Sequence, residues 1–156
     1  MELGVMIQLN DSIEQKLAQL AELGFRACQL CCWNNKMYTR ENADTVRAAA
    51  EQYGIEVTAL WAGWSGPKEW NFTYGPSTLG LVPAAYRGQR LMELHEASDF
   101  AQMLGVTDVI THVGFLPENP RDPDFVDTVG ALRNLCRAME AKVNVQIPVL
   151  FLRQEV

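Results

Sequence analysis

Short apolar runs rich in β-branched residues alternate with amphipathic segments along the first 142 residues of the chain. The amphipathic segments repeat their apolar positions with the period of an α-helix, and a glycine follows each of the first three. The positions predicted to be buried in these three segments are Ile13, Leu17, Leu20 and Ala21, then Ala43, Val46, Ala50 and Tyr53, then Leu91, Leu94, Ser98, Ala101 and Leu104. Consecutive strand–helix units of this kind form a parallel sheet through right-handed crossovers, so we expect an α/β fold. The expected strands cover residues 3–9, 26–32, 55–61 and 106–112, and the expected helices cover about 13–23, 41–53, 86–104 and 123–142.

The residues themselves leave two parallel architectures open. An open doubly wound sheet normally has a glycine-rich phosphate loop after its first strand, whereas Gln8-Leu-Asn-Asp-Ser12 contains no glycine. A closed (β/α)₈ barrel needs about 250 residues, and this chain has 156. Residues 143–156 occupy the place of a fifth strand, but Pro148 would remove a ladder hydrogen bond there. We expect these residues to form a short strand or an aberrant tail.

The charge of the chain argues against nucleic acid as a partner. The formal net charge is −6, the pI is about 4.9, and the basic residues are scattered singly. No apolar run reaches membrane-spanning length, so no membrane association is expected. Residues 1–9 lack the basic flank and the cleavage pattern of a signal peptide, and none is expected.

Four cysteines, Cys28, Cys31, Cys32 and Cys136, raise the question of a metal site. Cys28 and Cys31 have the spacing of a zinc-binding pair, but no second pair follows, and strand residues three apart point to opposite faces. We therefore expect buried free thiols and no metal bound by this chain. Free thiols also favour a cytoplasmic location.

His112 is the strongest candidate for a functional residue. It ends the fourth expected strand ahead of a Gly/Pro loop, and functional groups in parallel sheets gather where the strands end. Trp33, Trp61 and Trp64 follow the second and third strands, and Glu118 follows the fourth, so all five side chains are expected at one edge. The alternatives are a buried structural histidine, tryptophans that only pack, and a solvated carboxylate.

The connection over residues 62–85 is unusually long and holds much of the glycine, proline and aromatic content of the chain. Connections of this length without secondary structure are uncommon and often functional. We expect its aromatic residues Trp70, Phe72 and Tyr74 either to cover the site as a lid or to fill a hydrophobic gap.

Five short segments carry a resemblance to a known family. They are Leu3-Gly-Val-Met-Ile7, Cys28-Gln-Leu30 with Trp33-Asn34, Ala59-Leu-Trp-Ala-Gly-Trp-Ser-Gly-Pro67, Gly80-Leu-Val-Pro83 and Thr111-His-Val-Gly-Phe-Leu-Pro-Glu118. In this order, the segments resemble the sugar phosphate isomerase/epimerase family, whose barrel is shared with xylose isomerase and with the endonuclease IV type of DNA-repair enzyme. The resemblance covers residues 1 to about 142.

The resemblance implies the first half of a TIM-type barrel, with about four βα units and a possible fifth strand. Residues 1–142 would form this partial domain, and residues 143–156 the aberrant tail or short strand. Close relatives have a motif like Phe-Glu-Thr-Gly-Gln-Glu on the fifth strand, where this chain reads Phe151-Leu-Arg-Gln-Glu-Val156. Shifting the possible codons TTG-AGA-CAG by two bases gives Glu-Thr-Gly, so we hypothesise a frameshift near residue 142, which the downstream gene sequence would test.

By resemblance, the activity would be metal-assisted proton transfer next to a sugar carbonyl, with Mn, Mg, Co or Zn as the cofactor of full-length members. The glutamates and most metal ligands of the family belong to later strands, so this chain is expected to be inactive alone. Its partners would be a small sugar or sugar phosphate, bound by His112, Trp33, Trp61, Trp64 and Glu118, and a second copy joined at the exposed strand edges. The alternatives are a non-catalytic oligomerising or sugar-binding half-barrel and, disfavoured by net charge and by Trp61 in place of a further histidine, an abasic-site endonuclease.

Overall fold

The computed structural model describes residues 3–143 and 149–152. Its strands are β1 (Gly4–Gln8), β2 (Ala27–Cys32), β3 (Glu56–Ala62), β4 (Val109–Phe115) and β5 (Val149–Leu152). Its helices are α1 (Ile13–Glu22), α2 (Arg40–Tyr53), α3 (Gly75–Thr78), α4 (Ala84–Leu104) and α5 (Pro123–Val143), with a 3₁₀ turn η1 at Asn35–Met37.

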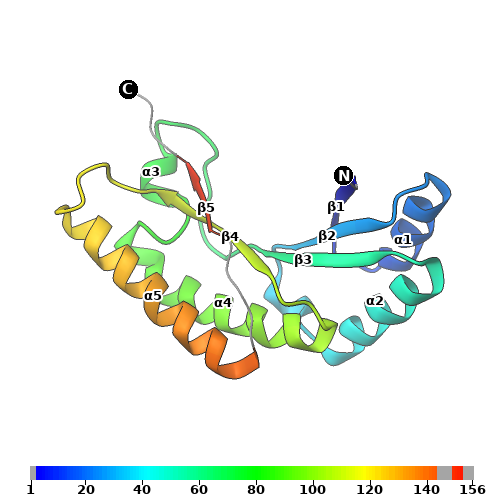
Figure 1. The fold of residues 1–156 in the computed structure, drawn as a ribbon. Helices are drawn as coiled ribbons and strands as arrows, with labels where there is room; N and C mark the ends of the chain where they lie inside the picture. The colour runs from blue at the N-terminus through cyan, green and yellow to red at the C-terminus, as the bar shows by residue number, and fades with distance from the viewer. Residues whose placement is uncertain (1–2, 144–148, 153–156) are drawn as a thin grey trace.

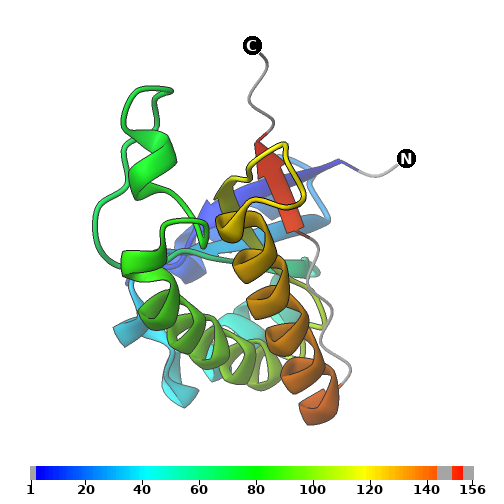
Figure 2. The ribbon, with the colours of Figure 1, turned by 90° about the vertical axis from the view of Figure 1, so that its left-hand side faces the viewer.

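The sheet has the order β1-β2-β3-β4-β5, and each neighbouring pair is parallel. The long helices α2, α4 and α5 lie along one side of this sheet, while α3 lies on the other side (Figure 1). Figure 2 shows the same sheet from the side of β5, and β1 and β5 are its outer strands. The expected α/β fold, a partial TIM barrel, is confirmed, and the described strands do not close into a barrel.

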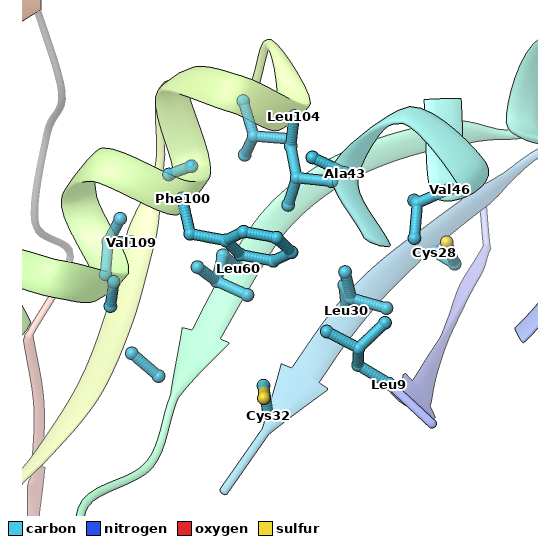
Figure 3. Packing of buried hydrophobic residues seen from close by; sticks show 14 of the residues in the cluster. Leu9, Cys28, Leu30, Cys32, Ala43, Val46, Leu60, Phe100, Leu104 and Val109 are labelled. Atoms are coloured by element: carbon cyan, nitrogen blue, oxygen red, sulfur yellow. The ribbon is translucent and has the colours of Figure 1, made fainter. Parts of the chain in front are cut away.

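The hydrophobic core lies between the sheet and the helices (Figure 3). Strand residues with two-residue spacing point into it, including Cys28, Leu30 and Cys32 of β2. Phe100 of α4 is fully buried and stacks on the ring of Tyr38 at 4.9 Å between centroids. Of the apolar positions predicted for the first two helices, Ala21 and Tyr53 are partly buried, and the others are buried: Ile13, Leu17, Leu20, Ala43, Val46 and Ala50.

The opposite face of the sheet is not covered by the long helices (Figure 1). Met6, Cys31, Trp61 and His112 belong to this face, because the alternation of strand side chains separates them from the core residues. Cys28 and Cys31 therefore lie on opposite faces, as the spacing predicted, and all four cysteines are free thiols. No described helix is both long and apolar enough to cross a membrane.

The expected bounds of the fourth strand need correction at both ends. Strand β4 covers Val109–Phe115 instead of residues 106–112, so His112 lies within the strand and not at its end. Residue Val106 instead completes the cap of α4, since its N–H bonds to the carbonyl of Ala101 after Gly105 in the left-handed conformation. At the other end, Phe115 pairs with Leu152 of β5, and the amides of Leu81 and Val82 bond to the carbonyl of Val113, at 2.6 and 3.2 Å.

The long connection between β3 and α4 is also not wholly irregular, because it contains the one-turn helix α3. In the C-terminal segment, residues 149–152 form the short strand that was one of the two alternatives. This strand lies at the edge of the sheet, where a preceding proline is tolerated. Pro148 itself lies outside the described residues, and the frameshift stays a hypothesis.

Candidate functional site

A cavity of about 620 Å³ lies on the face of the sheet that the long helices leave uncovered. Strands β1 to β4 each contribute to its walls, together with the loops that follow β2 and β3. Its lining consists of Met6, Cys31, Trp33, Trp61, Lys68, Trp70 and His112. Three indole rings and two sulfur-containing side chains make the walls largely apolar, with few polar groups among them. This composition is typical of small-molecule sites.

The protonation of His112 follows from its contacts. Its side chain is 2 % exposed, and Nδ1 accepts a hydrogen bond from the backbone N–H of Gly114 at 3.0 Å. Burial also lowers the pKa of His112 below its usual value, which keeps the ring neutral near pH 7. A neutral imidazole that accepts at Nδ1 carries its proton on Nε2. This Nε2–H has no hydrogen-bond acceptor among the described residues.

The tryptophan rings are arranged around His112. The Trp70 and His112 rings are perpendicular at 5.1 Å between centroids, and Trp33 contacts Trp70 at 6.0 Å and Trp64 at 5.3 Å. Trp70 is nevertheless 54 % exposed, so it covers the histidine from the solvent side. Trp61, like His112, is a lining residue of the cavity, and its buried N–H lacks an acceptor within the described part of the chain.

Helix α4 anchors the loop that carries Lys68 and Trp70. The buried Arg90 donates hydrogen bonds to the carbonyls of Gly80 at 2.6 Å and Pro67 at 2.8 Å, and its guanidinium lies 5.2 Å from the ring centre of Trp64. Burial lowers the pKa of Arg90 to about 10, so it stays charged at neutral pH. These bonds hold both ends of the loop against one helix.

Two glycines permit close approaches at the site. A Cβ atom on Gly80 would lie 2.0 Å from the backbone carbonyl of Val113, and Gly80 has a φ of +71°. A Cβ atom on Gly63 would lie 2.3 Å from the ring of Trp33. Both positions therefore exclude larger side chains, because the neighbouring backbone and indole occupy the space.

The structure brings together some of the residues predicted from the sequence. Trp33, Trp61 and His112 line one cavity. Trp64 is 1 % exposed and packs in a neighbouring cluster with Leu79 and Phe115 instead of lining the cavity. Glu118 is exposed in the loop after β4 and is not part of the lining. The binding roles of these residues stay predictions.

Sequence reasoning missed Lys68 and Arg90. Lys68 lines the cavity, and its signal in the sequence was that it is the one basic residue between positions 62 and 83. The buried face predicted for α4 included Leu91, which is only partly buried, and omitted Arg90, which is completely buried. A charged residue is normally assigned to the solvent side of a helix, so the sequence contained no direct signal for Arg90.

The described residues do not fit a resident metal ion. No group of three or more His, Cys, Asp or Glu side chains within residues 3–143 and 149–152 is arranged to hold one. His112 is also unsuited as a ligand through Nε2, because its Nδ1 is already an acceptor and Nε2 bears the proton. The group that His112 can bind through Nε2 is an acceptor such as an oxygen atom.

Comparisons with known proteins agree with this fold. A family model described as xylose isomerase-like TIM barrel matches residues 17–149. A xylose isomerase domain protein from Planctomyces limnophilus is 27% identical with a TM-score of 0.82, and the alignment covers 94% of this chain and 52% of that one. No curated protein sequence matches the chain.

Two further solved structures share the fold at lower identity. A D-psicose 3-epimerase determined in the presence of D-fructose is 15% identical with a TM-score of 0.61, covering 94% of this chain and 51% of that one. An AP endonuclease of family 2 from Brucella melitensis is 14% identical with a TM-score of 0.62, covering 96% and 55%. The chain thus spans about half the length of these solved proteins.

Proposed function

Because the chain belongs to the xylose isomerase-like TIM barrel family, we propose that its cavity is the sugar-binding wall of an isomerase or epimerase. Sugar-modifying enzymes are among its structural neighbours, which supports a small sugar as the ligand. Family members are typically metal-dependent. The residues of this cavity would bind and orient the sugar, while the metal and its chemistry would be supplied elsewhere.

One observation carries the proposal: two residues with buried N–H donors, which lack acceptors among the described residues, line a cavity walled by indole rings. Trp61 and His112 supply the donors, and Trp33 and Trp70 supply flat apolar faces. A sugar presents oxygen atoms at its edge and C–H groups on its faces, so it can satisfy the donors and contact the rings at once. A buried donor that stays unpaired is costly, and a ligand oxygen removes this cost.

Proton transfer next to a carbonyl needs a base and a group that stabilises the developing negative charge. No carboxylate is among the cavity-lining residues Met6, Cys31, Trp33, Trp61, Lys68, Trp70 and His112. We therefore propose that these residues bind the sugar without transferring the proton, and that the isolated chain is inactive. A non-catalytic sugar-binding role is the second candidate, favoured by the same lack of carboxylates in the lining.

Binding can be tested by ligand-observed NMR with D-fructose at millimolar concentration and the purified chain. Saturation transfer to the sugar is expected for the wild type and is expected to be lost in His112→Leu, because leucine has no hydrogen-bond donor. His95→Leu is the matched control, since His95 lies on α4 and does not line the cavity. Equal transfer in wild type and His112→Leu, or none in the wild type, would refute the proposal.

We also propose that two copies associate through the edges of their sheets. Strands β1 and β5 are the outer strands, and parallel edge strands expose unpaired backbone groups. Met6, 48 % exposed on the uncovered face, would become buried in such a pair. Light scattering should give the mass of a dimer, and a monomer at micromolar concentration would contradict this.

Abasic-site nuclease activity is not proposed, although one structural neighbour is an AP endonuclease. The cavity lining contains a single cationic side chain, Lys68, and the chain has a net charge of −6. A nuclease site normally has several phosphate contacts, which make DNA binding depend strongly on salt.

A further inference from the structure

We propose that the cavity selects acidic sugars, with Lys68, Trp61 and His112 binding an oxyanion of the ligand. The oxyanion is a carboxylate or a phosphate group. This inference rests on the proposed sugar-binding function and adds the class of sugar.

The polar side chains that line the cavity are all hydrogen-bond donors. The Nε2–H of His112, the Nε1–H of Trp61 and the ammonium group of Lys68 are hydrogen-bond donors. The remaining lining side chains are Met6, Cys31, Trp33 and Trp70, and their sulfur atoms and indole rings are weak acceptors at most. A neutral sugar hydroxyl carries its own proton and would need an acceptor in return. An oxyanion only accepts, so it satisfies these donors without leaving a buried proton unpaired.

Lys68 supplies a positive charge that the described residues do not neutralise. Its Nζ donates to the carbonyls of Gly66 at 3.2 Å and Trp64 at 3.4 Å and lies 5.7 Å from the ring centre of Trp33. The ion pairs formed by the described residues join arginines to aspartates and do not include Lys68. The neighbouring Glu69 is exposed and does not line the cavity.

The position of Lys68 is fixed from both sides. The carbonyl of the preceding Pro67 accepts a hydrogen bond from the buried Arg90 at 2.8 Å. The amide of the following Glu69 donates to the hydroxyl of Thr78 at 3.0 Å. The backbone that carries Lys68 is thus anchored on both sides, so binding need not order this segment.

Matched sugars separate this inference from the proposed function. Dissociation constants would be measured by ligand-observed NMR for D-glucose, D-glucuronate and D-glucose 6-phosphate, with wild type, Lys68→Met and Lys36→Met. Lys36 lies on η1 and does not line the cavity, so Lys36→Met is the control. We expect at least one anionic sugar to bind roughly tenfold more tightly than glucose to wild type and Lys36→Met. The difference should disappear in Lys68→Met.

The outcomes are distinguishable. Two acidic sugars that bind equally identify the shared oxyanion, and a preference for one identifies its carboxylate or phosphate. Equal binding of glucose and both anions to the wild type, or a preference that survives in Lys68→Met, would overturn the inference and leave sugar binding in place. Binding of none of the three sugars would overturn both proposals. Thermal denaturation of Lys68→Met would verify that it is folded, which is expected because the side chain is exposed.

Discussion

The backbone N–H of Gly114 donates a hydrogen bond to Nδ1 of His112 at 3.0 Å, two residues back along the same strand. Gly114 has a φ of +102°, a conformation that places its amide within reach of the histidine ring. The strand therefore selects the tautomer of its own functional side chain. The free donor at Nε2 and the neutral state of the ring both follow from this local geometry and from burial.

The burial of His112 should make the stability of the protein depend on pH. Burial lowers its pKa below 6.5, so in the unfolded chain the ring takes up a proton at higher pH than in the folded protein. In that window the unfolded state binds more protons, so the free energy of unfolding falls as the pH falls below about 6.5. Above this pH, His112 adds no pH dependence.

Urea denaturation at several pH values between 5 and 8 measures this effect. In His112→Gln, the free energy of unfolding should fall less below pH 6.5 than in the wild type, because the contribution of His112 is removed. In His95→Gln, it should fall as in the wild type. These are the two histidines of the chain, so each variant is a control for the other. Parallel pH profiles for wild type and His112→Gln would contradict the assignment.

Gly80→Ala should destabilise the protein strongly. The new Cβ would lie 2.0 Å from the carbonyl carbon of Val113, and the residue would be forced into a left-handed conformation. We expect a loss of more than about 2 kcal/mol in the free energy of unfolding. Gly88→Ala in α4 is the matched control, because its Cβ meets no atom within 4 Å, and it should gain up to about 1 kcal/mol. Similar denaturation midpoints for the two variants would disprove the close approach.

Arg90→Met should loosen the loop between β3 and α4. The variant keeps an apolar stem in the core but leaves the carbonyls of Gly80 and Pro67 without their donor. A cost of about 3 kcal/mol is expected from two unsatisfied acceptors. Hydrogen exchange and limited proteolysis should accelerate within residues 63–83, and Arg133→Met on the exposed side of α5 should change neither.

Trp70→Ala should weaken sugar binding with little effect on stability. The ring contacts His112 and Trp33 over the cavity, yet it is 54 % exposed and so contributes little to the core. Loss of one aromatic wall is worth about 1 kcal/mol, or roughly fivefold in Kd. Phe72→Ala changes another exposed aromatic residue of the same loop that does not line the cavity, and its Kd should equal that of the wild type. Weakening of both variants alike would indicate a general effect on the loop.

The periodic parts of the fold could be predicted because their signals are local. The stripe of Ile13, Leu17 and Leu20 is buried as its helical spacing predicted. The two-residue alternation likewise placed Cys28 and Cys31 on opposite faces of β2. Such patterns depend on backbone geometry within a few residues, so the sequence alone is sufficient to detect them.

The ends of β4 could not be predicted in this way, because contacts distant in sequence determine them. Pairing of Phe115 with Leu152 of β5 extends the strand beyond His112. The same limit explains Trp64, which follows the third strand like the other candidate residues but is enclosed by Leu79 and Phe115. The residues near Trp64 in the sequence do not indicate which side chains will pack around it in the fold.

The sequence by itself determined the parallel α/β architecture, the faces of its helices and the importance of the region around His112. Only the tertiary structure decided which side chains share the cavity and in which chemical state they do so. Lys68 faces the cavity because Arg90, 22 positions further along the chain, holds the carbonyl before it. His112 is a donor because a neighbouring amide and its burial select one tautomer. The hydrogen bond of Arg90 joins segments that are distant in the sequence, and the burial of His112 likewise requires that such segments pack together.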